Sequence, residues 1–196
     1  MTGQAEPSLQ SALPSWVKLV RLCLILCAIY VWAYFLSASL VLPLQQAVFP
    51  GTVMCFLFLP HGVRVMAAWL YGWRSVPLLI PGALLCNLHF AGERAFEADI
   101  LFGSAASLLA TPLVFAIGRR LGGADRLKVG TMRLPTLIAV GASGSVFNLT
   151  ALRLAYGLKP FDGMVIFIGD TLGLSVALLI VWLGLKLLPP RPPAAR

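Results

Sequence analysis

Four ionisable side chains fall within strongly apolar stretches of this 196-residue chain: His61, Arg64, Arg153 and Asp170. Ionisable groups inside an apolar span are costly to bury, and they tend to mark a function or a specific internal pairing. A guanidinium can hold an anion or a carboxylate, and an aspartate can serve as its counter-ion. These residues are therefore the first candidates for a functional site.

Arg153 and Asp170 lie on two successive apolar stretches that are expected to be antiparallel helices. At about 1.5 Å per residue, Asp170 is expected roughly 10 Å below the outer end of its helix and Arg153 about 6 Å below the outer end of the preceding one. The two side chains are thus predicted to meet, with Asn148 near the same level. Either a structural pair or a contact to a ligand would explain them.

A second candidate site lies where an apolar stretch is interrupted by Pro60-His61-Gly62, one helical turn before Arg64. Proline removes a backbone donor, so this span is predicted to break near mid-bilayer, and irregular backbone at that depth must be buried in protein or line a wet cavity. The free backbone groups and the guanidinium could together bind an anionic ligand. Alternatively, Arg64 caps carbonyls of a neighbouring helix and His61 makes one backbone bond. Asn87 and His89 are expected at the membrane interface.

The composition places these residues in a helical membrane protein. Hydrophobic residues make up 59% of the chain and charged residues 11%, and the mean hydropathy is +0.90. A membrane helix takes roughly 20 apolar residues, so the chain has room for one integral domain and no soluble catalytic domain. We expect an all-α, polytopic domain over 17–188, a disordered tail over 1–16 and a proline-rich tail over 189–196. The six expected spans cover about 19–42, 48–71, 75–91, 100–118, 134–157 and 163–188.

The basic residues predict the orientation of these spans. Of fifteen Lys and Arg, eleven fall on one side of the six-span arrangement, only Arg94 and Lys159 on the other, and two inside spans. Because Lys and Arg accumulate in cytoplasmic loops, both termini are predicted to be cytoplasmic, with the protein in a bacterial inner membrane. In such an apolar chain the basic excess sets topology, and no nucleic-acid partner is expected.

The sequence predicts no metal site, no cofactor and no enzymatic activity. Four cysteines lie in apolar stretches, where a thiol usually acts as a small hydrophobe, and two separated histidines do not form a ligand pattern. The segment Gly141-Ala142-Ser143-Gly144 is similar to the G-x-S-G nucleophile motif of rhomboid intramembrane proteases. That family takes its base from a histidine on a later helix, and no histidine follows His89, so proteolysis is a less favoured alternative.

Two longer segments together resemble another family. The stretch 58–74, followed by Pro77 and Pro81-Gly82, resembles the proline-glycine entry and glycine-arginine turn of bacterial membrane-associated sensor domains of the first, MASE-type, class. Phe167-Ile168-Gly169-Asp170-Thr171-Leu172-Gly173 resembles their glycine-aspartate-x-x-glycine helix. The resemblance covers about 45–90 and 140–188. It points to Pro60, His61, Gly62 and Arg64 on the broken span and to Gly169 and Asp170 on the last.

This resemblance implies a domain that detects a signal in or across the membrane. Typical members continue into a histidine kinase or a diguanylate cyclase, whereas this chain stops shortly after Lys186. We therefore expect a sensor-like or ligand-binding module that acts through a partner membrane protein and binds a small anionic ligand. The main alternative is an accessory or structural subunit of a larger membrane complex. A substrate-binding subunit of a transporter is less favoured.

Overall fold

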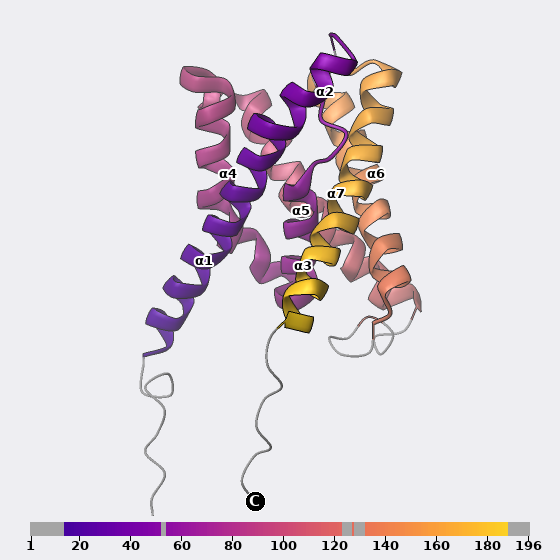
Figure 1. The fold of residues 1–196 in the computed structure, drawn as a ribbon. Helices are drawn as coiled ribbons and strands as arrows, with labels where there is room; N and C mark the ends of the chain where they lie inside the picture. Colours follow the sequence, from indigo (N-terminus) through magenta and orange to yellow (C-terminus); the bar gives the residue numbers. More distant parts are fainter. Residues whose placement is uncertain (1–13, 52–53, 123–126, 128–131, 188–196) are drawn as a thin grey trace, which may run out of the picture.

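The computed structural model describes residues 14–51, 54–122, 127 and 132–187, and the regular structure of this part of the chain is entirely helical. The elements form a bundle in which the start of the first helix and the end of the last lie at the same end (Figure 1). In chain order they are α1 (Ser15–Phe35), η1 (Leu36–Val41), α2 (Leu42–Val48), α3 (Leu59–Tyr71), η2 (Gly72–Arg74), α4 (Ser75–Ala91), η3 (Gly92–Phe96), α5 (Ala98–Gly122), α6 (Leu134–Tyr156) and α7 (Pro160–Leu187).

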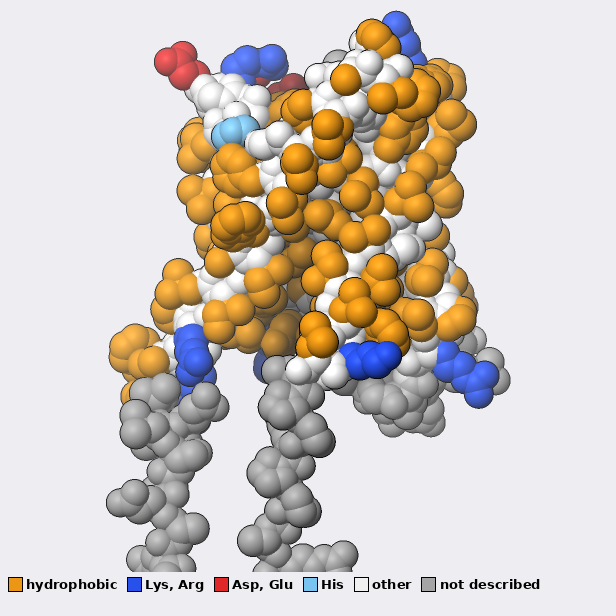
Figure 2. Space-filling view, viewed as in Figure 1, with side chains coloured by type: hydrophobic (Ala, Val, Ile, Leu, Met, Phe, Trp, Pro, Cys, Tyr) orange, Lys and Arg blue, Asp and Glu red, His pale blue; other side chains and the backbone are white. Residues whose placement is uncertain are grey.

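Five helical segments of the described chain are long and apolar enough to cross a membrane. Large hydrophobic side chains cover the outside of the bundle, and charged side chains gather at its two ends (Figure 2). This is the construction of a multi-pass helical membrane protein, in which lipid takes the place of water around the apolar surface. The five segments are Ser15–Val48, Leu59–Phe96, Ala98–Leu121, Leu134–Tyr156 and Pro160–Leu187.

The segment Leu59–Phe96 contains two separate helices. Gly72 ends α3 with a positive φ of 56°, a backbone conformation that glycine adopts without steric cost. The chain then turns through η2 into α4, and α3 and α4 contact each other along the bundle. The glycine-arginine turn that the sequence singled out is therefore a reversal of chain direction.

The first helix extends beyond its predicted end at Pro43 and continues to Val48. Between α1 and α2 the chain forms a π-helical turn, η1, and Pro43 occupies the first turn of α2. Proline is tolerated there because its missing N–H is not needed in the regular α-helical ladder. The start also differs, since Ser15 and Trp16, assigned to the tail by the sequence, begin α1. The remaining tail residues, 1–13 and 189–196, lie outside the described chain.

Helix α3 is the central element of the bundle. Nine of its thirteen residues are buried, and it contacts α1, α4, α5, α6 and α7. One apolar cluster joins α3 to α1 and α4 around Val63 and Leu79, and a second joins it to α5, α6 and α7 around Val65 and Leu174. Polar residues in the first two turns of α3 therefore face protein, whereas α1 and α7 each carry exposed side chains along much of their length.

The second apolar span is broken, but the break lies at residues 54–58, and Pro60-His61-Gly62, where it was expected, already belong to α3. Side chains of the first helical segment hold this stretch. Gln45 donates from Nε2 to the Met54 carbonyl and accepts at Oε1 from the Phe56 amide, both at 2.7 Å. Ser37 Oγ accepts from the Leu59 amide at 3.0 Å, at the start of α3. The side chains of Gln45 and Ser37 thus replace backbone bonds that a continuous helix would have made.

Helix α7 approaches the same stretch through small residues. The Phe58 amide donates to the Gly169 carbonyl at 2.9 Å. A Cβ added at Gly169 would overlap the Cys55 carbonyl, and one added at Gly173 would overlap the Phe58 carbonyl. The glycines let two backbones touch, and this contact brings the start of α3 to the level of Asp170.

Candidate functional site

A cluster of buried polar side chains surrounds Asp170, which is 1% exposed. Ser145 Oγ on α6 donates to Asp170 Oδ2 at 2.7 Å. From α3, Arg64 Nη2 lies 3.8 Å from Oδ1 and His61 Nδ1 lies 3.4 Å from Oδ2. A buried carboxylate needs both counter-charge and hydrogen-bond donors, and here it has both.

His61 contacts three polar groups, on α3, α6 and α7. Nε2 lies 3.0 Å from the Gly141 carbonyl oxygen, which only accepts, so Nε2 carries a hydrogen and donates. Nδ1 lies 3.4 Å from both Arg64 Nη2 and Asp170 Oδ2. His61 thus lies between the guanidinium and the carboxylate, and the charges of Arg64 and Asp170 balance each other.

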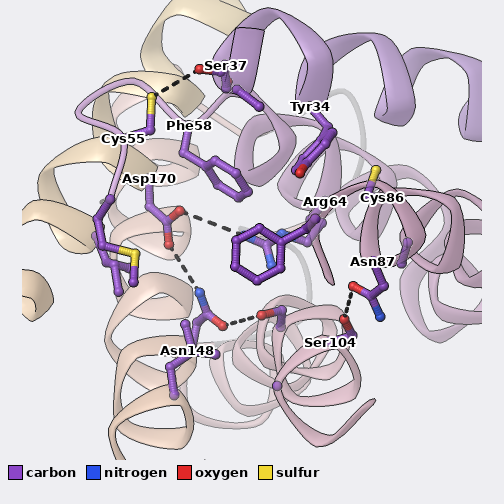
Figure 3. A pocket seen from close by; sticks show the side chains of 18 of the residues that line it. Tyr34, Ser37, Cys55, Phe58, Arg64, Cys86, Asn87, Ser104, Asn148 and Asp170 are labelled. Atoms are coloured by element: carbon purple, nitrogen blue, oxygen red, sulfur yellow. Dashed lines mark hydrogen bonds and ion pairs between the residues drawn. The ribbon is translucent and has the colours of Figure 1, made fainter. Parts of the chain in front are cut away.

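Asn148 connects the cluster to helix α5. Its Nδ2 donates to Asp170 Oδ2 at 3.4 Å, and its Oδ1 accepts from Ser107 Oγ on α5 at 2.6 Å. Hydrogen bonds thus connect Ser107 on α5, Asn148 on α6 and Asp170 on α7. Figure 3 shows the bond between Asn148 and Asp170. The predicted place of Asn148 beside Asp170 agrees with this geometry.

The predicted pairing of Arg153 with Asp170 is wrong. Arg153 is exposed in the last turn of α6, and the guanidinium near Asp170 is that of Arg64. The physical reason is the broken span: α3 begins deep in the bundle against Gly169, so its first turns lie at the level of Asp170. Arg153, close to a helix end, can extend its long side chain out of the apolar layer.

A cavity of about 280 Å³ adjoins the cluster, between the first helical segment and the helices α3 to α7. Arg64, Asn148 and Asp170 line it, and the Phe58 ring lies against Arg64, with 5.7 Å between the ring centroid and Cζ (Figure 3). Arg64 is 3% exposed, yet its Nε has no hydrogen-bond partner in the described chain. A buried donor on a cavity is a place where a ligand can bind.

The other residues indicated by the sequence support the fold around this cavity. Pro60 is buried in the first turn of α3, and a Cβ at Gly62 would crowd Ala177 and the backbone of α7. Gly169 lets α7 touch the stretch before α3, and His61 supports Arg64 without lining the cavity. Arg64, Asn148 and Asp170 are the predicted site residues that line the cavity.

Several polar cavity residues were missed by the sequence reasoning. Asn87 was expected at the interface, but it lines the cavity, and its Oδ1 accepts from Ser104 Oγ at 2.8 Å. Its Nδ2 is buried without a hydrogen-bond partner in the described chain. Ser104 and Ser107 both line the cavity, and their spacing of three residues on one helix was the available signal.

The G-x-S-G segment does not contribute its serine to this site. Ser143 is exposed on α6 and donates to the Ala139 carbonyl one turn earlier, at 2.9 Å. Gly141, in contrast, packs against Leu174 and supplies the carbonyl that accepts from His61. Within the described residues, no three His, Cys, Asp or Glu side chains converge on a common point. The small residues of this segment serve helix packing.

Comparison with known proteins adds no assignment to this geometry. No protein-family model, no curated protein and no solved structure matches the chain.

Proposed function

We propose that this chain is an integral membrane ligand-binding module of sensor type, which holds a small molecule in the cavity beside Arg64. The observation that carries the proposal is the Arg64 side chain, which is 3% exposed, lines a cavity of about 280 Å³ and has no hydrogen-bond partner for its Nε among the described residues. Pockets with apolar walls and a few convergent polar groups are the usual form of small-molecule sites. The module has no catalytic role and passes occupancy on to a partner membrane protein.

The proposed topology has six crossings with both ends of the chain in the cytoplasm. The second crossing consists of residues 54–58 and the short helix α3, and α4 forms the third. The start of α1 and the end of α7 lie at the same end of the bundle, which supports this arrangement (Figure 1). Lys18 and Lys186 then lie on the cytoplasmic side, in keeping with the bias of basic residues toward that side.

The arrangement of the cavity supports a route from ligand to partner. Met54, Cys55 and Phe58 line the cavity and belong to the stretch that contacts α7 at Gly169. A ligand that shifts this stretch would also shift α7, which ends on the proposed cytoplasmic side. The π-helical turn also faces the cavity through Ser37 and Ala38, and such turns are frequent at functional sites.

The accessory-subunit alternative has less support. A purely structural subunit would fill its interior and pair its buried charges completely. Here a cavity remains beside Arg64, whose Nε has no partner in the part of the chain that the structure describes, and Arg64 Nη2 lies 3.8 Å from Asp170 Oδ1, beyond hydrogen-bond length.

Native mass spectrometry of the protein, gently extracted from its own membrane, tests the proposal. We expect a defined small-molecule adduct on the wild-type chain. Arg64→Lys keeps a positive charge near Asp170 but removes the Nε donor, and it should reduce the adduct to roughly a tenth or less. Arg153→Lys is the matched control at an exposed arginine and should retain the adduct. A wild-type chain without an adduct, or an adduct retained by Arg64→Lys, would overturn the proposal.

A further inference from the structure

We infer that the cavity selects a neutral amphiphile whose head carries hydrogen-bond-accepting carbonyl oxygens, an ester or ketone rather than a carboxylate. This inference rests on the proposed function and names the chemical class of its ligand. It departs from the anionic ligand that the sequence suggested, because the sequence paired Asp170 with Arg153 and left Arg64 without a counter-charge.

The charges around the cavity are the first support. The carboxylate of Asp170 balances the guanidinium of Arg64, and His61 does not line the cavity. A ligand carboxylate bound to Arg64 would lie beside the buried Asp170 carboxylate without an additional cation among the cavity-lining residues. Burying an uncompensated charge in an apolar environment is strongly unfavourable, whereas a neutral carbonyl oxygen does not carry that cost.

The unpaired donors are the second support. Two buried nitrogen atoms of cavity-lining residues, Arg64 Nε and Asn87 Nδ2, have no hydrogen-bond partner in the described chain. Both can only donate, so the complementary ligand atoms are acceptors. Figure 3 shows Asp170 on one side of Arg64 and Asn87 on the other, which places the second donor away from the balanced charge pair.

The walls are the third support. Most of the remaining lining is apolar or aromatic, including Tyr30, Leu42, Ile100, Leu152 and Ile166. Such walls suit a hydrocarbon chain or ring, and a volume of about 280 Å³, near the lower limit for small-molecule sites, suits a single short chain. A small amphiphile with a carbonyl head therefore fits both the polar and the apolar lining of the cavity.

Two probes of matching chain length separate the neutral from the anionic class. Methyl decanoate carries a neutral ester, and decane-1-sulfonate carries a permanent negative charge. Each is titrated calorimetrically into the full chain in lipid nanodiscs, with empty nanodiscs correcting for partition into lipid. We expect saturable binding of the ester and at least about tenfold weaker binding of the sulfonate.

Two variants test whether Asn87 takes part. Asn87→Asp keeps the acceptor for Ser104 but removes the Nδ2 donor, and it should weaken ester binding about three- to tenfold. Ser143→Ala, the control, removes an exposed hydroxyl that bonds within its own helix away from the cavity, and it should change binding less than about twofold. The thermal unfolding midpoint of each variant shows whether its fold is intact, and if Asn87→Asp is unstable, Asn87→Leu replaces it.

The outcomes distinguish this inference from the proposed function. Sulfonate binding equal to or stronger than ester binding, or ester binding unaffected by loss of the Asn87 donor, would overturn the neutral class. The native adduct lost in Arg64→Lys would still support a binding module in that case. Failure of both probes to bind overturns the inference if the native adduct is present, and absence of the adduct as well overturns both proposals.

Discussion

Asp170 on α7 faces Arg64 on α3 in the buried centre of the bundle, with 3.8 Å between Asp170 Oδ1 and Arg64 Nη2. The two side chains are 1% and 3% exposed, so each depends on the other for compensation of its charge. The pairing fixes the short central helix against the last helix and places the guanidinium at the cavity. It is the contact from which the stability and the proposed binding of this protein can be tested together.

Removing the charge of Asp170 should destabilise the protein. We expect Asp170→Asn to lower the free energy of unfolding by about 3–5 kcal/mol, because it leaves Arg64 buried without a counter-charge. Equilibrium unfolding in mixed micelles measures this loss, and Arg153→Gln should change the same quantity by less than about 0.5 kcal/mol. A double-mutant cycle should couple Asp170→Asn to Arg64→Gln. Coupling to Arg153→Gln instead would contradict the observed pairing.

Glycines on α7 should differ sharply in their tolerance of alanine. Gly169→Ala and Gly173→Ala place a Cβ where the backbone of residues 55–58 lies, so each should lower the free energy of unfolding by about 1–3 kcal/mol. Gly184, on the same helix, has nothing within 4 Å of an added Cβ. Gly184→Ala should therefore be neutral or stabilise by up to about 1 kcal/mol. Equal effects at the three positions in thermal unfolding would show that α7 does not touch the broken span.

The hydroxyl of Ser37 should contribute to stability by holding the start of α3. Ser37→Ala leaves the Leu59 amide without its acceptor in a buried place, and we expect a loss of about 1–3 kcal/mol. Ser143→Ala removes an exposed hydroxyl that bonds within its own helix, and its effect should stay below about 0.5 kcal/mol. The second variant should also bind ligand normally. Loss of function in Ser143→Ala with an intact fold would revive the proteolytic alternative.

Accessibility of single cysteines to a membrane-impermeant maleimide tests the six-crossing topology. The reference is a variant in which Cys23, Cys27, Cys55 and Cys86 are replaced by alanine. Lys159→Cys and Arg94→Cys should react in intact cells with a permeable outer membrane, because both positions are exposed at the proposed outer end.

The opposite end of the bundle provides the control for this labelling. Lys18→Cys and Lys186→Cys are exposed at the proposed cytoplasmic end and should react only after the inner membrane is opened. Labelling of Lys18→Cys in intact cells would invert the topology. Opposite labelling of Lys18→Cys and Lys186→Cys would rule out an even number of crossings.

The sequence by itself determined the class of the fold and most of its elements. Long apolar runs predict helices in lipid, since only helices and closed barrels satisfy backbone groups there, and the predicted span over 75–91 coincides with α4. The proline and glycine pattern around Pro60 predicted a break in the second span, because proline removes a backbone hydrogen-bond donor. The prediction failed locally at Pro43, because a π-helical turn placed this proline in the first turn of α2.

Only the tertiary structure decided which polar groups meet. Depth estimated from sequence assumes that each span begins at a membrane surface, and α3 begins deep inside the bundle, so the estimate matched Asp170 with the wrong arginine. Asn87 and Ser104 reach the cavity because α4 and α5 turn those faces inward, which local hydropathy does not encode. The hydrogen-bond contact of His61 with Gly141 and the pairing of Arg64 with Asp170 likewise join residues that are 80 and 106 positions apart. Such contacts exist only once the helices have packed around α3.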